Sequence, residues 1–169
     1  MQKKEWPNYS KNLILEINKI LNSGIVNYTI GNYGEKFEKS FSVYTGIANC
    51  TSCSNGTTAL QLALLAAGLG PGDEIICHQH SHIYLYEAGA WAAISGCSVR
   101  LLEGDRGQFG AEDVANAIQM DDHHFPCSRL LSIENTHNRD GGTVFFRWAL
   151  RDADFLTTLF VCTLRFCPL

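Results

Sequence analysis

Three short stretches of the sequence carry side chains that can bind ligands or move protons near neutral pH. In the first, Gly56, Thr57 and Thr58 open a run rich in alanine and leucine. If that run is a helix, its first N–H groups have no partner within the helix, and together with the helix dipole they favour an anion such as a phosphate. The alternative is an ordinary capped start of a helix, which residues of these types also form.

His82 is the second candidate, because an imidazole can stack on a flat pyridine ring and titrates near neutral pH. Glu87, five positions later, can hold that imidazole in one orientation. The alternative is a histidine in a polar loop and a carboxylate at a helix N-terminus, where the helix dipole favours negative charge. His124, the third candidate, lies in the run His123-His124-Phe125-Pro126, which is equally typical of a polar loop.

A metal site is the competing interpretation of two of these regions. Cys50 and Cys53 form a C-x-x-C pair, and the segment from Cys77 to His82 contains one cysteine and three histidines. However, no second pair of ligands follows at the spacing typical of a zinc finger. We therefore expect no metal site.

Helices and strands that alternate along the chain must position these residues. Apolar periodicity predicts a helix between Ser10 and Gly24, and the following segments are assigned in the same way. Helices are predicted over residues 37–44, 57–67, 87–94 and 111–118, and strands over residues 74–77, 99–102 and 130–133. The helix over residues 57–67 is apolar almost all round, so we expect it to be buried on a sheet. Short connections between alternating helices and strands indicate an α/β fold with a mostly parallel sheet.

Composition indicates a globular protein and argues against partners such as nucleic acids and membranes. A chain of 169 residues with 46% hydrophobic residues is long enough for one globular domain. The net charge is −4 and all six lysines lie within the first 39 residues, so we expect no nucleic-acid partner. No apolar run approaches the roughly 20 residues that span a bilayer, so we expect no membrane association. Seven cysteines at irregular spacing indicate reduced thiols and a cytoplasmic protein.

Longer motifs resemble two families of enzymes that meet near residue 75. The run Ser52-Cys53-Ser54-Asn55-Gly56-Thr57-Thr58-Ala59-Leu60 lies in residues 1–73, which resemble the DegT/DnrJ/EryC1/StrS sugar aminotransferases. The runs His82-Ile83-Tyr84-Leu85-Tyr86-Glu87-Ala88-Gly89 and Glu134-Asn135-Thr136-His137-Asn138 lie in residues 72–144, which resemble low-specificity L-threonine aldolases, a beta-eliminating lyase family. Residues 146–169 match neither family.

Both resemblances imply the same fold and cofactor, a three-layer fold-type-I domain that binds pyridoxal 5'-phosphate. They imply that Gly56, Thr57 and Thr58 bind the phosphate. The aldolase resemblance further implies that His82 covers the ring and that His124 lies near the substrate's β-hydroxyl group. The aldolase resemblance implies cleavage of a β-hydroxy-α-amino acid to glycine and an aldehyde. The alternative is transfer of an amino group to a nucleotide sugar. Complete members of both families are homo-oligomers.

Two groups that this chemistry requires are not found in the expected context. The cofactor needs a lysine for its aldimine and an acid beside its pyridine nitrogen. No lysine follows Lys39, and Asp152 and Asp154 lack the aldolase context. We therefore expect a truncated large domain over residues 1–145, an unmatched tail over residues 146–169, and little or no activity of the chain alone. A further alternative is a fused or frame-disrupted gene product without function.

Overall fold

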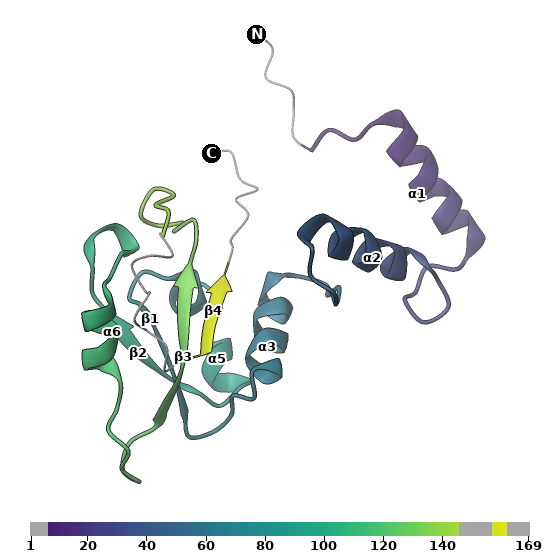
Figure 1. Cartoon of the computed structure of the whole chain (residues 1–169). Helices are drawn as coiled ribbons and strands as arrows, with labels where there is room; N and C mark the ends of the chain where they lie inside the picture. Colours follow the sequence, from purple (N-terminus) through teal and green to yellow (C-terminus); the bar gives the residue numbers. More distant parts are fainter. Residues whose placement is uncertain (1–6, 146–156, 162–169) are drawn as a thin grey trace. The chain divides into compact units, whose positions relative to one another are not determined.

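The computed structural model describes residues 7–145 and the backbone of residues 157–161 (Figure 1). The chain divides into two compact units, residues 1–53 and residues 54–169. Most of the tail predicted over residues 146–169 lies outside the described residues. The predicted boundary at residue 145 therefore stays a prediction.

The first unit contains two helices of equal length, α1 (Lys11–Ser23) and α2 (Tyr33–Thr45). Ser10 caps α1, because its side-chain oxygen accepts the N–H of Leu13 at 3.2 Å. Each helix ends at a glycine in the left-handed conformation, Gly24 with φ of +70° and Gly46 with φ of +73°. Both helices predicted in this part of the sequence are confirmed.

The second unit is built on a four-stranded sheet in which every pair of neighbouring strands is parallel. The strand order is β2-β1-β3-β4, with bounds β1 (Asp73–His78), β2 (Ser98–Leu102), β3 (Cys127–Glu134) and β4 (Thr157–Val161). The pairing of β1 with β3 contains one irregularity. Glu74 pairs with Ser128 but Ile75 pairs with Leu130, so Arg129 is an extra residue of the bulge type. The predicted parallel sheet is confirmed.

Helices cover both faces of this sheet. They are α3 (Gly56–Ala66), α4 (His82–Leu85), α5 (Ala90–Ala93) and α6 (Ala111–Ala117), with a 3-10 turn at Asp105–Gly107. Successive side chains of a strand point to opposite faces. Ile75 packs with Leu64 of α3 on one face, and Ile76 packs with Val114 of α6 on the other. The result is the predicted three-layer α/β arrangement.

The helix predicted to be buried on the sheet, α3, buries only one side. Gln61 and Leu64 are its buried residues, whereas Leu62 and Leu65 are 44% and 52% exposed. A run that is apolar at almost every position has no periodicity, so its sequence does not show which side faces the sheet. The helix thus packs on the sheet as expected, but it is less buried than predicted.

The single helix predicted over residues 87–94 is also wrong in extent. The structure has two short helices instead, α4 before that range and α5 within it. Between them Ala88 has φ of +51° and Gly89 has φ of +70°. Left-handed residues interrupt a right-handed helix, so the backbone at Ala88 and Gly89 separates the two turns.

Buried cysteines provide a first test of this core. Burial raises the pKa of the Cys77 thiol to about 12 and also raises the pKa of Cys97. Because the thiolate is the reactive form, iodoacetamide at neutral pH should modify both at least about 100-fold more slowly than exposed Cys127. Peptide mass spectrometry over a time course measures the rates, and urea should equalise them. Equal rates in the native protein would contradict this packing.

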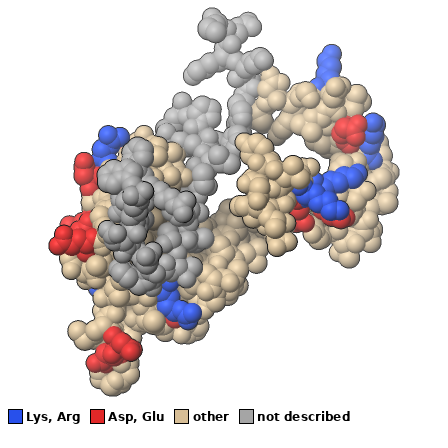
Figure 2. Space-filling view, viewed as in Figure 1, with Lys and Arg blue, Asp and Glu red and all other residues tan. Residues whose placement is uncertain are grey.

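Charged side chains are dispersed on the visible surface. On the face shown in Figure 2, lysine and arginine side chains alternate with aspartate and glutamate and form no broad patch of one sign. Within the described residues, no helix combines the length and apolar character needed to cross a bilayer. The expected cytoplasmic location and the expected absence of a nucleic-acid partner stay predictions.

Candidate functional site

One edge of the sheet gathers the segments that sequence analysis selected. Since β1 and β3 are parallel neighbours, the loops that follow His78 and Glu134 leave the sheet at the same edge. Helix α3 leads into β1 through a short turn and runs in the opposite direction, so its first residue lies at that edge as well (Figure 1). In α/β folds, ligands bind beyond the carboxyl ends of the strands.

The first turn of α3 offers donors to an anion. The side chain of Asn55 accepts the N–H of Thr58 at 2.8 Å, which caps the helix. The N–H groups of Gly56 and Thr57 have no partner within the helix, and both residues are exposed. A side chain at Gly56 would begin in open space. The start of α3 therefore has room and donors for a phosphate.

His82 is held in place on two sides. Its Nε2 lies 3.1 Å from Oε1 of Glu87, and its backbone N–H donates to Oε2 of Glu134 at 2.6 Å. Glu87 is 5% exposed, whereas about a third of the His82 side chain remains accessible, with an exposed fraction of 32%. The structure thus brings Glu87 to His82 as predicted and leaves part of the imidazole accessible to a ligand.

Glu134 was missed as a functional residue. Its carboxylate accepts the N–H of His82 through one oxygen and the N–H of Asn138 through the other, at 2.6 and 2.9 Å. One buried carboxylate therefore joins the loop after β1 to the loop after β3. A charged residue directly after the mainly apolar run from Leu130 to Ile133 was the signal in the sequence that could have revealed it.

A cluster of histidines lies beside these loops. His137 is 2% exposed, and its Nδ1 lies 3.1 Å from Oδ2 of Asp140. The ring of His78 meets the ring of His137 edge to face, with centroids 5.2 Å apart. Desolvation by burial lowers the pKa of His78 below its ordinary value. His137 and Asp140 were not among the predicted site residues. They follow β3, whereas His78 ends β1, so the sequence alone does not show that they meet.

His124 lies elsewhere. It lies in the loop that leads into β3, which places it at the amino edge of the sheet, opposite the edge that carries His82. Its N–H donates to Oδ1 of Asp122 at 2.9 Å, and its exposed ring lies 3.8 Å from that of His123. Within this chain the structure does not bring His124 to His82. A role of His124 near the substrate stays a prediction.

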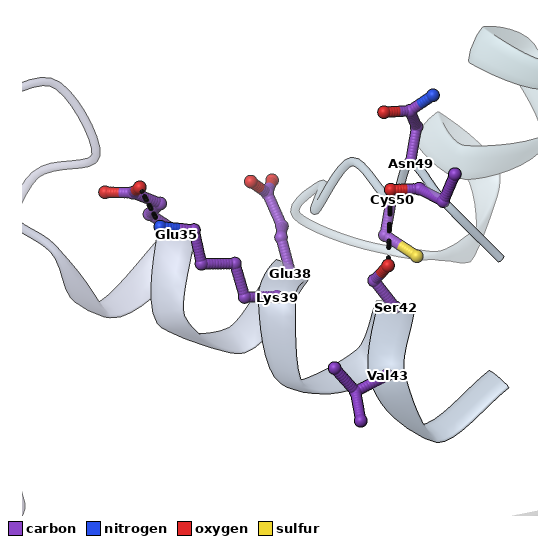
Figure 3. A pocket seen from close by; sticks show the side chains of 8 residues that line it. Glu35, Glu38, Lys39, Ser42, Val43, Asn49 and Cys50 are labelled. Carbon is purple, nitrogen blue, oxygen red and sulfur yellow. Dashed lines mark hydrogen bonds and ion pairs between the residues drawn. The ribbon is translucent and has the colours of Figure 1, made fainter. Parts of the chain in front are cut away.

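The first unit has a pocket of its own, of about 460 Å³, between α2 and the segment that follows it (Figure 3). Its polar side chains already contact one another. Glu35 pairs with Lys39 at 2.7 Å, and Ser42 Oγ donates to the carbonyl oxygen of Ala48 at 3.2 Å. The pocket therefore presents a weaker case for ligand chemistry than the sheet edge of the second unit.

Comparison with known families shows to which family the chain belongs. Residues 28–157 match the family model of the beta-eliminating lyases. The chain belongs to the beta-eliminating lyase family. This membership confirms the family suggested by the runs from His82 to Gly89 and from Glu134 to Asn138.

Individual relatives of this beta-eliminating lyase chain point to two activities. It is 39% identical over 99 residues to the low specificity L-threonine aldolase of Escherichia coli O157:H7, which covers 58% of this chain and 28% of the aldolase. It is 47% identical over 55 residues to GDP-perosamine synthase of Caulobacter vibrioides, and the match covers 32% of this chain and 15% of the synthase. The crystal structure of 3-amino-5-hydroxybenzoic acid synthase superposes on this chain with a TM-score of 0.65 at 26% identity. The superposition covers 78% of this chain and 32% of the synthase. The chain thus spans less than a third of the length of these matched proteins.

The families to which the chain is similar depend on pyridoxal phosphate, and the site fits part of this cofactor. The exposed start of α3 suits the phosphate. The accessible imidazole of His82 suits the ring, and its Nδ1 is buried without a hydrogen-bond partner among the described residues. However, residues 54–169 include no lysine. The second unit therefore offers groups that suit the phosphate and the ring, but its sequence contains no lysine amine for a covalent link.

Proposed function

We propose that this lyase-family chain binds pyridoxal phosphate non-covalently at the carboxyl edge of its sheet. The enzyme class that best suits the site is a threonine aldolase, which cleaves a β-hydroxy-α-amino acid to glycine and an aldehyde. The observation that carries this proposal is the fixation of His82 by Glu87 and Glu134 at the edge where α3 begins.

Each residue of the site has a defined task in this proposal. The N–H groups of Gly56 and Thr57 and the hydroxyl groups of Thr57 and Thr58 bind the phosphate at the positive end of α3. The imidazole of His82 covers one face of the pyridine ring. When bound, the cofactor supplies an electron sink for the Cα of an amino acid.

The carboxylates of the site act on His82 rather than on the substrate. Glu87 fixes the orientation of the imidazole through Nε2, and Glu134 fixes the backbone to which the imidazole is attached. Because Glu134 also accepts the N–H of Asn138, movement of the loop after β3 is coupled to the position of His82. Both carboxylates are positioning residues in this scheme.

A nucleotide-sugar aminotransferase is the second candidate. The Asn55 cap and the hydroxyl groups of Ser54 and Thr58, whose oxygens lie 3.5 Å apart, build the start of α3 within the aminotransferase-like run. The similarity to GDP-perosamine synthase also supports this candidate. Binding of a nucleotide sugar would support the aminotransferase, and binding of a β-hydroxy amino acid would support the aldolase.

Cofactor binding tests the proposal directly. Replacing His82 by alanine removes the stacking surface, so the Kd for pyridoxal phosphate should rise about 10-fold, equivalent to about 1.4 kcal/mol. Quenching of tryptophan fluorescence and the visible absorption of the cofactor measure the Kd. The matched control is His123→Ala, which removes an exposed imidazole at the opposite edge and should leave the Kd unchanged.

Two results would count against this function. Equal weakening by His82→Ala and His123→Ala would show that binding does not involve the proposed edge. If the unaltered chain does not bind pyridoxal phosphate, the remaining alternative is a fused or frame-disrupted product that keeps only the ancestry of the family.

A further inference from the structure

The loops after β1 and β3 bring together donor atoms that lie about 60 positions apart in the sequence. His78 is the last residue of β1, whereas His137 and Asp140 follow β3. One nitrogen or oxygen atom from each of these three side chains lies within 4.8 Å of the other two. Two imidazoles and one carboxylate therefore lie close together at the sheet edge.

The donors on the β3 side are buried and unsatisfied. Neither ring nitrogen of His137 has a hydrogen-bond partner among the described residues, and Oδ2 of Asp140 has none either. Buried polar groups are nearly always hydrogen-bonded, so three such atoms on two neighbouring side chains require an explanation. Nδ1 of His137 lies 3.1 Å from Oδ2 of Asp140. Two ligands of one tetrahedral zinc ion, each about 2.0–2.1 Å from it, are about 3.3 Å apart.

His78 presents the tautomer that a metal ligand needs. Its Nε2 contacts the carbonyl oxygen of Gly104 at 3.2 Å, and its Nδ1 accepts the N–H of His80 at 3.2 Å. The proton therefore resides on Nε2, which leaves a lone pair on Nδ1. Histidine ligands of metals commonly donate their second N–H to a backbone carbonyl in this way. A cation would replace only the long contact from His80.

Neighbouring residues enclose the three side chains and offer a fourth ligand. Nδ1 of His80 lies 3.6 Å from Oδ1 of Asp140, and its half-exposed ring can approach as a fourth ligand. Gly107 closes the other side, since a Cβ atom there would lie 2.3 Å from Cδ2 of His137. A carboxylate oxygen of Glu134 lies 4.0 Å from Nε2 of His137, which adds negative charge beside the three side chains.

We propose that His78, His137 and Asp140 bind one divalent transition-metal cation, with Zn²⁺ best matched to two imidazoles and one carboxylate. This site departs from the sequence-based expectation of no metal, which considered only ligands close together in the sequence. The ion would fasten the loop after β1 to the loop after β3. The site is independent of the proposed cofactor, so its test omits pyridoxal phosphate.

Cobalt titration tests the site, because Co²⁺ absorbs visible light strongly in a four-coordinate environment. Untagged protein is freed of metal with a chelator and titrated with Co²⁺ alone. We expect saturation at one Co²⁺ per chain, displacement by Zn²⁺, and no thiolate-to-cobalt absorption band, since no cysteine is among the ligands. Absence of a saturable signal would overturn the proposal.

Two matched variants locate the ion. Asp140→Asn keeps the size of the side chain and should weaken Co²⁺ binding at least about 10-fold. Asp122→Asn removes a carboxylate from the exposed group formed with His123 and His124, and should leave the affinity unchanged. Unchanged affinity in Asp140→Asn, or loss of binding in Asp122→Asn, would refute the site.

A measurement on the unaltered protein avoids dependence on the folding of a variant. The side-chain nitrogen resonances of histidine shift strongly when a nitrogen binds a metal. Addition of one equivalent of Zn²⁺ should shift Nδ1 of His78 and His137 and leave both rings of the exposed pair, His123 and His124, unchanged. Shifts confined to the exposed pair would place the ion elsewhere and would contradict the proposal.

Discussion

Purified protein supplied with pyridoxal phosphate and L-allo-threonine should release acetaldehyde no faster than pyridoxal phosphate alone. The reason is the absence of any lysine from residues 54–169, which removes the amine that ordinarily carries the cofactor. Loss of a catalytic nucleophile typically costs on the order of 10⁶-fold in rate. A coupled alcohol dehydrogenase assay, with a complete threonine aldolase as the positive control, measures the release.

Borohydride reduction followed by mass spectrometry is the matching control. With no amine at the site, reduction should leave no stoichiometric adduct on a single lysine. A single modified lysine among those of the first unit, together with release of acetaldehyde above the background, would contradict the prediction. That result would show that another part of the chain supplies the amine.

Glu134→Ala should lower the free energy of unfolding of the second unit by about 3 kcal/mol. The change leaves the N–H groups of His82 and Asn138 without their acceptor, and each unsatisfied buried group costs about 1–3 kcal/mol. Urea denaturation followed by circular dichroism measures the loss as a lower midpoint with little change in slope.

The control for this variant is Glu103→Ala, at an exposed glutamate that follows β2. It removes the same charge from the same unit and should change the unfolding free energy by less than about 0.5 kcal/mol. If both variants unfold at the same urea concentration, the carboxylate of Glu134 does not fasten the two loops. A loss in Glu134→Ala that is restored by salt alone would also argue against hydrogen bonding as its cause.

Local features made much of the fold predictable. Ser10 and Gly24 mark the two ends of α1, and short apolar runs such as Ile75-Ile76 identify the strands. Prediction failed where the signal was not periodic. The uniformly apolar α3 does not reveal its buried side, and the break at Ala88 and Gly89 depends on backbone angles rather than on hydrophobicity.

The contacts of the candidate site also include some that the sequence predicts and some that it does not. Glu87 and His82 are five positions apart, so their pairing could be expected from the sequence. The contacts of Glu134 with His82, and of His137 with His78, depend on which strands are neighbours in the sheet. Strand order is a property of the whole fold, and no local pattern in this sequence encodes it.

The extra residue Arg129 in β3 has a consequence for how the strand tolerates changes in length. Ser128 pairs with Glu74, and Leu130 pairs with Ile75, so the bulge resets the alternation of side chains just before the apolar half of the strand. Deleting Arg129 would restore regular pairing and leave Leu130 to Glu134 facing as they do now. Deleting Ser132 would instead shift the strand by one position on one side of the deletion. Either Leu130 and Leu131 or Ile133 and Glu134 would then face the wrong side of the sheet. Deletion of Arg129 therefore keeps the faces of the strand and costs only its 3.6 Å ion pair with Asp73, whereas deletion a few residues later reverses those faces.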